Sequence, residues 1–534
     1  MTRLTQFDHS SSPPGIQVPR IYNAAHDLLD RNLQAGRADK LAYVDDRSAC
    51  TYRELTRRVN RFASALLAMG LRREERVMIC MLDTIDWPVA FLGAIKAGVV
   101  PVAVNTLLKR QDYEYMLRDS RARVLFVSQT LLPSFEGLLD GTIDSLQQVI
   151  VSNAPATETS AFEAMLADGD EVFEPAATVA DEACFWLYSS GSTGAPKGCV
   201  HVHASLLQTA GLYGIPVLGI NEHDVVFSAA KLFFAYGLGN GLSFPLAVGA
   251  TTILMAERPT PDAVFRRLTG ASPAGGLKPT VYCGVPTLYA AMLANEGFPS
   301  REQLHLRVCA SAGEALPEQI GTRFSERTGV EILDGIGSTE MLHIFLSNRS
   351  GSVRYGTTGK PVPGYDIRLL DEQGSAVADG EVGDLYIRGA TAAAAYWNQR
   401  ERSRTTFQGE WTRSGDKYVR DAQGYYTYAG RSDDMLKVSG QYVSPFEVES
   451  ALSSHDAVLE AAVVGASDAD ALVKPKAFVV LKPGHEGGDA MRETLKAHVK
   501  SRLAPFKYPR WIEFVGELPK TATGKIQRFR LRAD

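Results

Sequence analysis

The sequence YSSGSTGAPKG at residues 188–198 has the composition of a loop that surrounds phosphate oxygens. Its glycines let backbone N–H groups approach an anion closely, its hydroxyl side chains add short hydrogen-bond donors, and Lys197 supplies positive charge. The spacing differs from the common P-loop, which keeps four residues between its glycines, because only two residues separate Gly191 from Gly194. Pro196 disfavours a helix just before the lysine, so we expect a phosphate loop that does not open a helix there.

The alternative interpretation of these residues is a flexible Gly/Ser linker. A linker is disfavoured because the loop follows the apolar run CFWLY at 184–188, which has the pattern of a buried strand. We therefore predict a strand that leads directly into a phosphate-binding loop.

Length, charge and composition exclude several classes of protein. A chain of 534 residues is too long for a single hydrophobic core, and its net charge of −5 argues against a nucleic-acid or anionic-membrane binder. The most apolar stretch, 89–104, is interrupted by Lys96 and Pro101, and the N-terminus lacks the apolar core of a secretion signal. The six cysteines form no CxxC pair, which favours reduced thiols in a cytoplasmic enzyme.

Hydrophobic periodicity predicts an α/β fold with helices on both faces of mostly parallel sheets. From residue 53 helical and strand-like spacings alternate, and this alternation resumes after the phosphate loop. The predicted helices span 53–69, 87–97 and 111–118. The predicted strands span 76–82, 99–104, 123–128, 225–229, 250–255, 280–283 and 306–310.

Two changes of texture predict further units. From about residue 353 glycines punctuate short strands, as in GDLYIRG at 383–389, which indicates a small β-rich subdomain. The residues from 433 onward have the pattern of a compact α+β unit. The predicted domains are a large N-terminal domain at 1–432 and a small C-terminal lid domain at 433–534.

Four separated motifs carry a resemblance to a known family. They are YSSGSTGAPKG at 188–198, DGIGSTEM at 334–341, a series from TRSGD to GRSDD within 412–434, and PKTATGK at 519–525. In this order they make the chain resemble the acyl-adenylate-forming ligases, which include acyl- and aryl-CoA synthetases, luciferases and peptide-synthetase adenylation domains. The segments KLFFAYGLGNG at 231–241 and DGIGSTEMLHIF at 334–345 are most similar to benzoate-CoA ligases and close aryl relatives.

The resemblance implies two half-reactions. A carboxylate and ATP would give an acyl-AMP and pyrophosphate, and the thiol of coenzyme A would then displace AMP. The first step brings an anionic carboxylate to an anionic phosphate, and two unit charges 4 Å apart repel by about 4 kcal/mol at an effective dielectric near 20. Cations must therefore be placed in advance. The cofactors that the resemblance implies are ATP, Mg²⁺ and coenzyme A.

The phosphate-binding roles follow from the same resemblance. Thr339 would add a hydroxyl to the phosphates, Glu340 would bind Mg²⁺, and Lys525 would bridge the reacting carboxylate and the α-phosphate. The residues that would hold the departing pyrophosphate are Ser190, Gly191, Ser192, Thr193, Gly194 and Lys197.

The resemblance also implies a nucleoside site and a coenzyme A site. Asp416 and Arg431 would bind the ribose, with a turn-capping aspartate as the alternative for Asp416. Ile336 stands where the family commonly has an aromatic residue, so aliphatic packing would replace ring stacking there. Lys437 and Gly440 would lie beside the coenzyme A tunnel. The residues implied around the adenine are Ala312, Gly313, Glu314, Asp334, Gly335 and Ile336.

The implied acid site is a flat apolar slot, which suits an aryl acid. Phe234 stands where many relatives have a histidine, so that side of the slot is apolar here. For His343 a structural, hydrogen-bonded role remains as open as a role in the pocket. The residues implied around the acid are Phe234, Ala235, Tyr236, Gly337, His343 and Ile344.

Several expectations concern motion and partners. By resemblance, Asp433 is a hinge that rotates the small domain between the half-reactions, with an ordinary turn as the alternative. Lys525 is a candidate site for modification by a lysine acetyltransferase, which would switch the enzyme because acetylation removes the charge of the lysine. A homodimer is left open. No nucleic acid or membrane partner is expected.

Two other functions compete with an aryl-CoA ligase that acts on benzoate. A stand-alone adenylation enzyme would load an aryl or related acid onto a carrier protein. Amino-acid modules place an aspartate where this chain has FFAYG at 233–237, and none stands there. A nucleotide-binding regulator without chemistry is disfavoured by the intact set Thr339, Glu340, Asp416 and Lys525.

Overall fold

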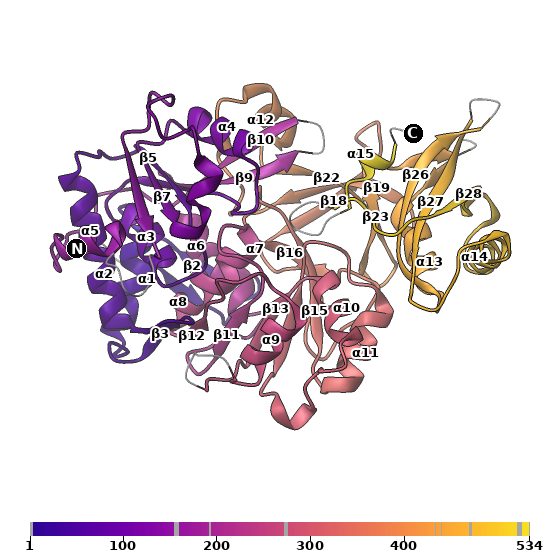
Figure 1. Ribbon diagram of the computed structural model, residues 1–534, viewed down its shortest axis with the longest axis horizontal. Coiled ribbons are helices and arrows are strands. Elements are labelled where there is room, and N and C mark those ends of the chain that lie inside the picture. The colour runs from indigo at the N-terminus through magenta and orange to yellow at the C-terminus, as the bar shows by residue number, and fades with distance from the viewer. Residues whose placement is uncertain are drawn as a thin grey trace.

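The computed structural model describes residues 4–153, 160–191, 194–271, 276–432, 434–438, 441–468, 472–520 and 526–532. It confirms the α/β class: two large, mostly parallel sheets with helices, an antiparallel subdomain and a small C-terminal α+β unit. Figure 1 shows the C-terminal elements, orange to yellow, gathered at one end of the molecule. No helix in the described part of the chain combines the length and apolar character of a membrane span.

The first sheet has seven strands in the order β20-β10-β9-β6-β5-β7-β8. The five strands from β9 to β8 are parallel, and β10 runs antiparallel to both of its neighbours. The strands are β5 (Arg76–Cys80), β6 (Val100–Ala103), β7 (Val124–Ser128), β8 (Gln148–Ser152), β9 (Ala183–Gly191), β10 (Gly194–Val202) and β20 (Ala395–Tyr396). The predicted strands in this region are confirmed.

The predicted helices of this region are also confirmed, and their ends follow from local chemistry. They are α2 (Tyr52–Ala68), α3 (Asp86–Lys96) and α4 (Arg110–Ser120). The hydroxyl of Thr51 accepts the backbone N–H of Glu54 and so caps the start of α2. Along α2, Leu55, Val59 and Phe62 recur at helical spacing and are fully buried.

The second sheet has nine strands in the order β17-β16-β15-β14-β13-β11-β12-β3-β4. The strands from β15 to β3 are parallel. The strands are β3 (Leu41–Val44), β4 (Ala49–Thr51), β11 (Val225–Ser228), β12 (Thr251–Ile253), β13 (Val281–Gly284), β14 (Val308–Ser311), β15 (Ile332–Gly337), β16 (Ile344–Ser347) and β17 (Lys360–Pro361). The helices α9 (Pro261–Leu268), α10 (Pro286–Ala294) and α11 (Glu318–Thr328) accompany it.

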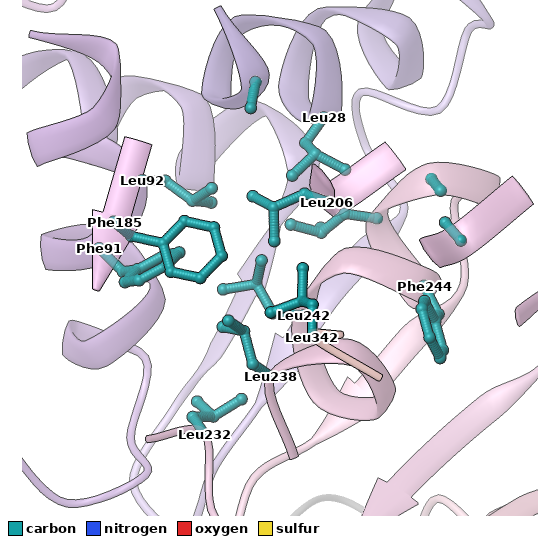
Figure 2. Close-up of a cluster of buried hydrophobic side chains, with 14 of the residues drawn as sticks. Leu28, Phe91, Leu92, Phe185, Leu206, Leu232, Leu238, Leu242, Phe244 and Leu342 are labelled. Atoms are coloured by element: carbon teal, nitrogen blue, oxygen red, sulfur yellow. The ribbon is translucent and has the colours of Figure 1, made fainter. Parts of the chain in front are cut away.

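One buried core joins the two sheets. Figure 2 shows Leu28 from α1 (Ala24–Gln34), Phe185 from β9 and Leu206 from α6 (Ala204–Thr209) in the same cluster as Leu342. Phe91 and Leu92 come from α3, and all of these side chains are at most 2% exposed. The core therefore fixes the first sheet against the turn between β15 and β16. All six cysteines are free and buried, as the sequence predicted.

Two further units follow. The predicted β-rich subdomain is an antiparallel sheet of β18 (Asp366–Leu370), β19 (Val382–Arg388), β21 (Phe407–Gln408), β22 (Trp411–Arg420) and β23 (Tyr426–Arg431). The C-terminal unit consists of β24 (Leu436–Val438), β25 (Gln441–Val443), α13 (Pro445–Ser453), β26 (Val458–Ser467), β27 (Val473–Leu481), α14 (Asp489–Arg502), β28 (Trp511–Phe514) and α15 (Arg528–Leu531). This C-terminal unit has a hydrophobic cluster of its own, which includes Leu452, Val463, Val479 and Leu495.

A buried arginine fastens α9 to the β3–β4 end of the second sheet. The side chain of Arg267 is 1% exposed, and its guanidinium donates to both carboxylate oxygens of Asp46 at 2.7 Å. It also donates to Glu257 at 2.7 Å. Arg266 contacts the same glutamate at 2.9 Å, but its side chain is 48% exposed.

We predict that Arg267→Ala lowers the free energy of unfolding by about 2–4 kcal/mol, because several charge-assisted hydrogen bonds and buried packing are lost together. The matched control, Arg266→Ala, should lower it by less than about 1 kcal/mol, because exposed ion pairs contribute little. Urea unfolding followed by circular dichroism compares the two variants. Equal losses would contradict the assignment of Arg267 as the fastening residue.

Candidate active site

The described residues of the predicted phosphate loop, 188–191 and 194–198, lie in two paired antiparallel strands of the first sheet, β9 and β10. Strands β9 and β10 pair Ser189 with Lys197, with an irregular register towards the turn. Lys197 therefore lies in a strand and opens no helix, as Pro196 led us to expect. The hydroxyl of Tyr115, from α4, donates to the carbonyl of Pro196 at 3.2 Å and ties the hairpin to that helix.

Only part of the loop can be located. Ser192 and Thr193 lie outside the described residues. For Ser190, Gly191 and Gly194 the structure describes the backbone, which belongs to the two strands. Of the predicted ligands, Ser190 and Gly191 thus end β9, and Gly194 and Lys197 lie at the beginning of β10.

The turn between β15 and β16 carries Thr339 and Glu340. Leu342 closes the turn with a φ of +66°, a left-handed conformation that a residue with a side chain rarely adopts. Its N–H donates to the carbonyl of Thr339 at 3.2 Å, and its own side chain is buried. The same carbonyl accepts a hydrogen bond from Nε2 of His201 at 2.7 Å, so β10 holds the turn directly.

The carboxylate of Glu340 lies next to Lys197 of the β9–β10 hairpin, which is called the phosphate hairpin below. Its Oε1 lies 3.7 Å from Nζ of Lys197 and accepts hydrogen bonds from the hydroxyls of Tyr396 at 2.7 Å and Ser189 at 3.3 Å. Burial alone would raise the pKa of Glu340, but the Lys197 charge and these hydroxyl donors bring that pKa below its ordinary value. Glu340 is therefore ionised at neutral pH and able to bind a cation.

The described residues contain no group of three or more His, Cys, Asp or Glu side chains that could enclose a metal ion. A single ionised carboxylate next to a phosphate site nevertheless fits Mg²⁺, which proteins bind through one or two carboxylates together with substrate phosphates. Glu340 is the residue that would hold it.

The predicted ribose residues face each other across two strands. Asp416 in β22 and Arg431 in β23 are register partners, and the guanidinium donates to the carboxylate at 3.0 Å. The N–H of Asp416 donates to the hydroxyl of Ser414, while its buried carboxylate points to the arginine. The structure thus brings together the two side chains that the resemblance assigned to the ribose.

The predicted adenine residues lie at the carboxyl ends of β14 and β15, where ligands of parallel sheets bind. Asp334 in β15 stands beside Ser311, the last residue of β14, and Ala312 follows it. Both side chains are buried. Burial raises the pKa of Asp334 well above its ordinary value, and the neighbouring Ser311 hydroxyl opposes that rise. A buried carboxyl and a buried hydroxyl at this point are suited to a polar ligand edge.

Tyr418 in β22 connects the adenine and ribose regions. Its buried phenol lies 3.2 Å from the hydroxyl of Thr358, and burial together with the charge of Asp416, two residues earlier in β22, raises its pKa. On the other side, Ile344 of the acid set packs over Gly335 of the adenine set: a Cβ at Gly335 would lie 2.9 Å from a methyl of Ile344.

The predicted acid residues surround one histidine. Phe234 precedes α7 (Ala235–Leu238), which continues through the π-helix η3 (Gly239–Ser243) into α8 (Phe244–Val248). His343 is 2% exposed and its ring centroid lies 4.5 Å from that of Phe244 and 5.6 Å from that of Tyr236. Gly239 leaves room for the imidazole, because a Cβ there would lie 2.3 Å from His343 Cδ2.

His343 is hydrogen-bonded to the segment that carries Tyr236. Its Nε2 lies 3.3 Å from the carbonyl of Tyr236, which can only accept, so Nε2 carries the proton. Among the described residues, Nδ1 of His343 and the hydroxyl of Tyr236 are buried without a partner. Burial lowers the pKa of His343 to about 3. The histidine thus anchors the acid segment, and its Nδ1 remains unpaired within it.

Two residues that hold the segment 231–241 in place were not identified from the sequence. The buried carboxylate of Asp83, which follows β5, accepts the N–H of Leu232 at 3.2 Å, and burial raises the pKa of Asp83 to about 6. Gly237 allows the chain to cross itself, because a Cβ there would lie 2.0 Å from the carbonyl oxygen of Lys231. Asp83 lies outside every recognisable motif, so no sequence pattern marks it.

The predicted residues of the small domain are only partly located. Lys525, Asp433 and Gly440 lie outside the described residues, and for Lys437 only the backbone, in β24, is described. Arg528 in α15 pairs with Glu449 at 2.6 Å and lies 3.5 Å from Asp434. These contacts place the chain that follows Lys525 near the chain that follows Asp433.

The chain is similar to known proteins over most of its length. The model of the AMP-binding enzyme family matches residues 29–397, and the model of the AMP-binding enzyme C-terminal domain matches residues 447–525. A benzoate–CoA ligase of Thauera aromatica is 62% identical over 535 residues, with 100% of both chains covered.

Two solved structures are similar over 96% of this chain. A benzoate CoA ligase from Burkholderia xenovorans LB400 has 58% identity and a TM-score of 0.88, and 100% of that chain is covered. The anthranilate CoA ligase AuaEII, in complex with anthranoyl-AMP, has 45% identity and a TM-score of 0.89, and 97% of that chain is covered.

The buried histidines give a test of the site geometry. Burial lowers the pKa of His343 to about 3 and that of His201 to about 4, so both stay neutral down to pH 5. We predict that both carry the proton on Nε2, since that atom faces a carbonyl in each case. Nitrogen-15 NMR of histidine-labelled protein between pH 7 and 5 reports tautomer and charge. A titration of either ring above pH 5 would contradict the geometry.

Proposed function

The chain belongs to the AMP-binding enzyme family, and we propose that it is an AMP-forming aryl-acid–CoA ligase that acts on benzoate. It would convert benzoate, ATP and coenzyme A into benzoyl-CoA, AMP and pyrophosphate. The observation that carries the reaction type is the meeting of Lys197 and Glu340, which joins a phosphate hairpin to a cation-binding carboxylate. The choice of benzoate is supported by the full-length similarity to a benzoate–CoA ligase.

In the first half-reaction the carboxylate of the acid attacks the α-phosphate and pyrophosphate leaves. The hairpin around Lys197 binds the β- and γ-phosphates of the leaving group, and Thr339 adds its hydroxyl. Glu340 would hold the nucleotide's Mg²⁺, which would neutralise phosphate charge when bound. Lys525 bridges the reacting carboxylate and the α-phosphate, so positive charge is present where negative charge accumulates.

The nucleoside is bound by the residues on the other side of the turn. Asp416 accepts hydrogen bonds from the ribose hydroxyls, with Arg431 beside it. Asp334 and Ser311 offer their buried oxygens to the adenine edge, and Ile336 packs against its face. Ala312, Gly313 and Glu314 complete the wall after β14.

The acid lies against neutral, mostly apolar groups. Phe234, Ala235 and Tyr236 line it from α7, and Gly337 and Ile344 from the strands β15 and β16. His343 contributes an imidazole that burial keeps uncharged at pH 7, so it does not compete with Lys525 for the carboxylate. An aryl ring is suited to such a slot because it contributes apolar area and no further charge.

The second half-reaction needs a different face of the small domain. We propose a boundary at 432/433 with the hinge at Asp433, and a coenzyme A site beside Lys437 and Gly440. The separate hydrophobic cluster after residue 435 supports a unit that can rotate as a body. Rotation would withdraw Lys525 and open the adenylate to the thiol.

We also propose that the protein forms a homodimer and that Lys525 is acetylated by a lysine acetyltransferase. The proposed location is the cytoplasm, where ATP and coenzyme A are available. Native mass spectrometry reports the first, and peptide mass spectrometry of protein from several growth conditions reports the second. A monomer alone, or an unmodified lysine throughout, would contradict them.

We predict that coenzyme A accelerates AMP release from benzoate and ATP and is converted into benzoyl-CoA. The assay compares three acceptors with benzoate, ATP and Mg²⁺ present: none, coenzyme A, and a phosphopantetheinylated carrier protein. Mass spectrometry identifies the thioester. Acceleration by the carrier protein but not by coenzyme A would favour the carrier-loading alternative and contradict the ligase.

We predict that Lys525→Ala slows adenylation by about 10²–10⁴-fold, which corresponds to about 3–5 kcal/mol of lost transition-state stabilisation. Thioester formation from supplied benzoyl-AMP should be largely preserved. Lys520→Ala is the matched control, because Lys520 lies in the same basic segment but pairs with Glu460. Comparable damage to both half-reactions in the Lys525 variant would contradict its half-specific role.

A further inference from the structure

Tyr396 lies where the first sheet contacts the turn that carries Glu340, and the sequence motifs assign it no function. It ends β20, the edge strand that pairs Tyr396 with Cys199 next to the phosphate hairpin. The side chain is 3% exposed and packs on Phe407 with a centroid distance of 5.2 Å. Its backbone N–H donates to the hydroxyl of Ser403 at 3.0 Å. The phenol is therefore fixed in place by the strand and by its neighbours.

The single proton of the Tyr396 hydroxyl goes to Glu340. Lys197 Nζ lies 3.3 Å from the phenolic oxygen and can only donate, so that oxygen accepts from the lysine. The phenol in turn donates to Oε1 of Glu340 at 2.7 Å. Burial and the charge of Glu340 raise the pKa of Tyr396, so the phenol keeps its proton and stays a donor. Lys197 also lies over the ring, 4.6 Å from its centroid.

The donors from other described residues all converge on one oxygen of Glu340. Tyr396 and Ser189 donate hydrogen bonds to Oε1, and the Lys197 ammonium lies 3.7 Å from the same oxygen. The backbone is held as well, because the N–H of Ala393 donates to the carbonyl of Glu340 at 2.8 Å. A carboxylate whose backbone and Oε1 are both fixed cannot rotate freely, so the direction of Oε2 is fixed too.

Given the proposed function, we propose that Tyr396 is a positioning residue: it holds Oε1 of Glu340 so that Oε2 faces the Mg²⁺ of the bound nucleotide. When the phosphates of ATP attract Lys197, the lysine leaves its contact with the carboxylate. The phenol then remains as the donor that keeps Glu340 oriented and ionised. Groups that orient a metal ligand in this way typically change metal affinity by about 10–100-fold when removed.

The test is Tyr396→Phe, which removes the hydroxyl and keeps the ring that packs on Phe407 and lies under Lys197. Isothermal titration calorimetry without benzoate measures the dissociation constant of ATP in EDTA and in excess Mg²⁺. Mg²⁺ should lower the dissociation constant of ATP by a factor that is about 10–100-fold smaller in the variant than in the wild type. The dissociation constant measured in EDTA should be unchanged. A merely structural role would weaken both constants equally, and that result would overturn the inference.

The matched control is Tyr52→Phe. Tyr52 is also a fully buried tyrosine, and its hydroxyl donates to the carbonyl of Ala250 at 2.6 Å, outside the site. In the Tyr52→Phe variant, Mg²⁺ should tighten ATP binding by the same factor as in the wild type. Because the titration needs no turnover, it separates the two proposals. Wild-type protein that binds Mg·ATP but forms no benzoyl-CoA contradicts the proposed function, whereas an unchanged Tyr396→Phe variant contradicts only the role of Tyr396.

Discussion

The contact between Lys197 and Glu340 is the constraint on which the rest of the structure depends. The lysine belongs to the first sheet and the glutamate to a turn of the second, and their charged atoms are 3.7 Å apart. At an effective dielectric near 20 their attraction is about 4 kcal/mol, and it falls as the sheets separate. The core drawn in Figure 2 keeps the sheets in place, and Leu342 of that core closes the turn itself.

The site divides the work between charged and neutral halves. In the predicted phosphate region Lys197 pairs with Glu340, and in the predicted ribose region Asp416 pairs with Arg431. Around the acid, burial keeps His343 uncharged and leaves aromatic rings as the main surface. Under the proposed function, charge would bind the nucleotide and shape would bind the acid, so the same reaction can be kept while the acid changes.

The fold could be predicted further than the site. The helix predicted at 53–69 is confirmed as α2, and Lys197 opens no helix, as Pro196 indicated; both predictions rested on local sequence alone. Tyr396, His201 and Asp83 could not be predicted, because each acts through a contact with a distant segment and none stands in a pattern that marks it. For His343 the structure adds a hydrogen bond that sequence alone left open. Lys525 and Asp433 stay predictions, since both lie outside the described residues.

The central claim is that the acid is activated as an acyl-adenylate before any thiol takes part. Exchange of labelled pyrophosphate into ATP tests it directly, because exchange requires reversible formation of the adenylate. With benzoate and Mg²⁺ but no coenzyme A, we expect labelled ATP to accumulate, and none to accumulate when benzoate is left out. Exchange that appears only after coenzyme A is added, or that ignores benzoate, would contradict the claim.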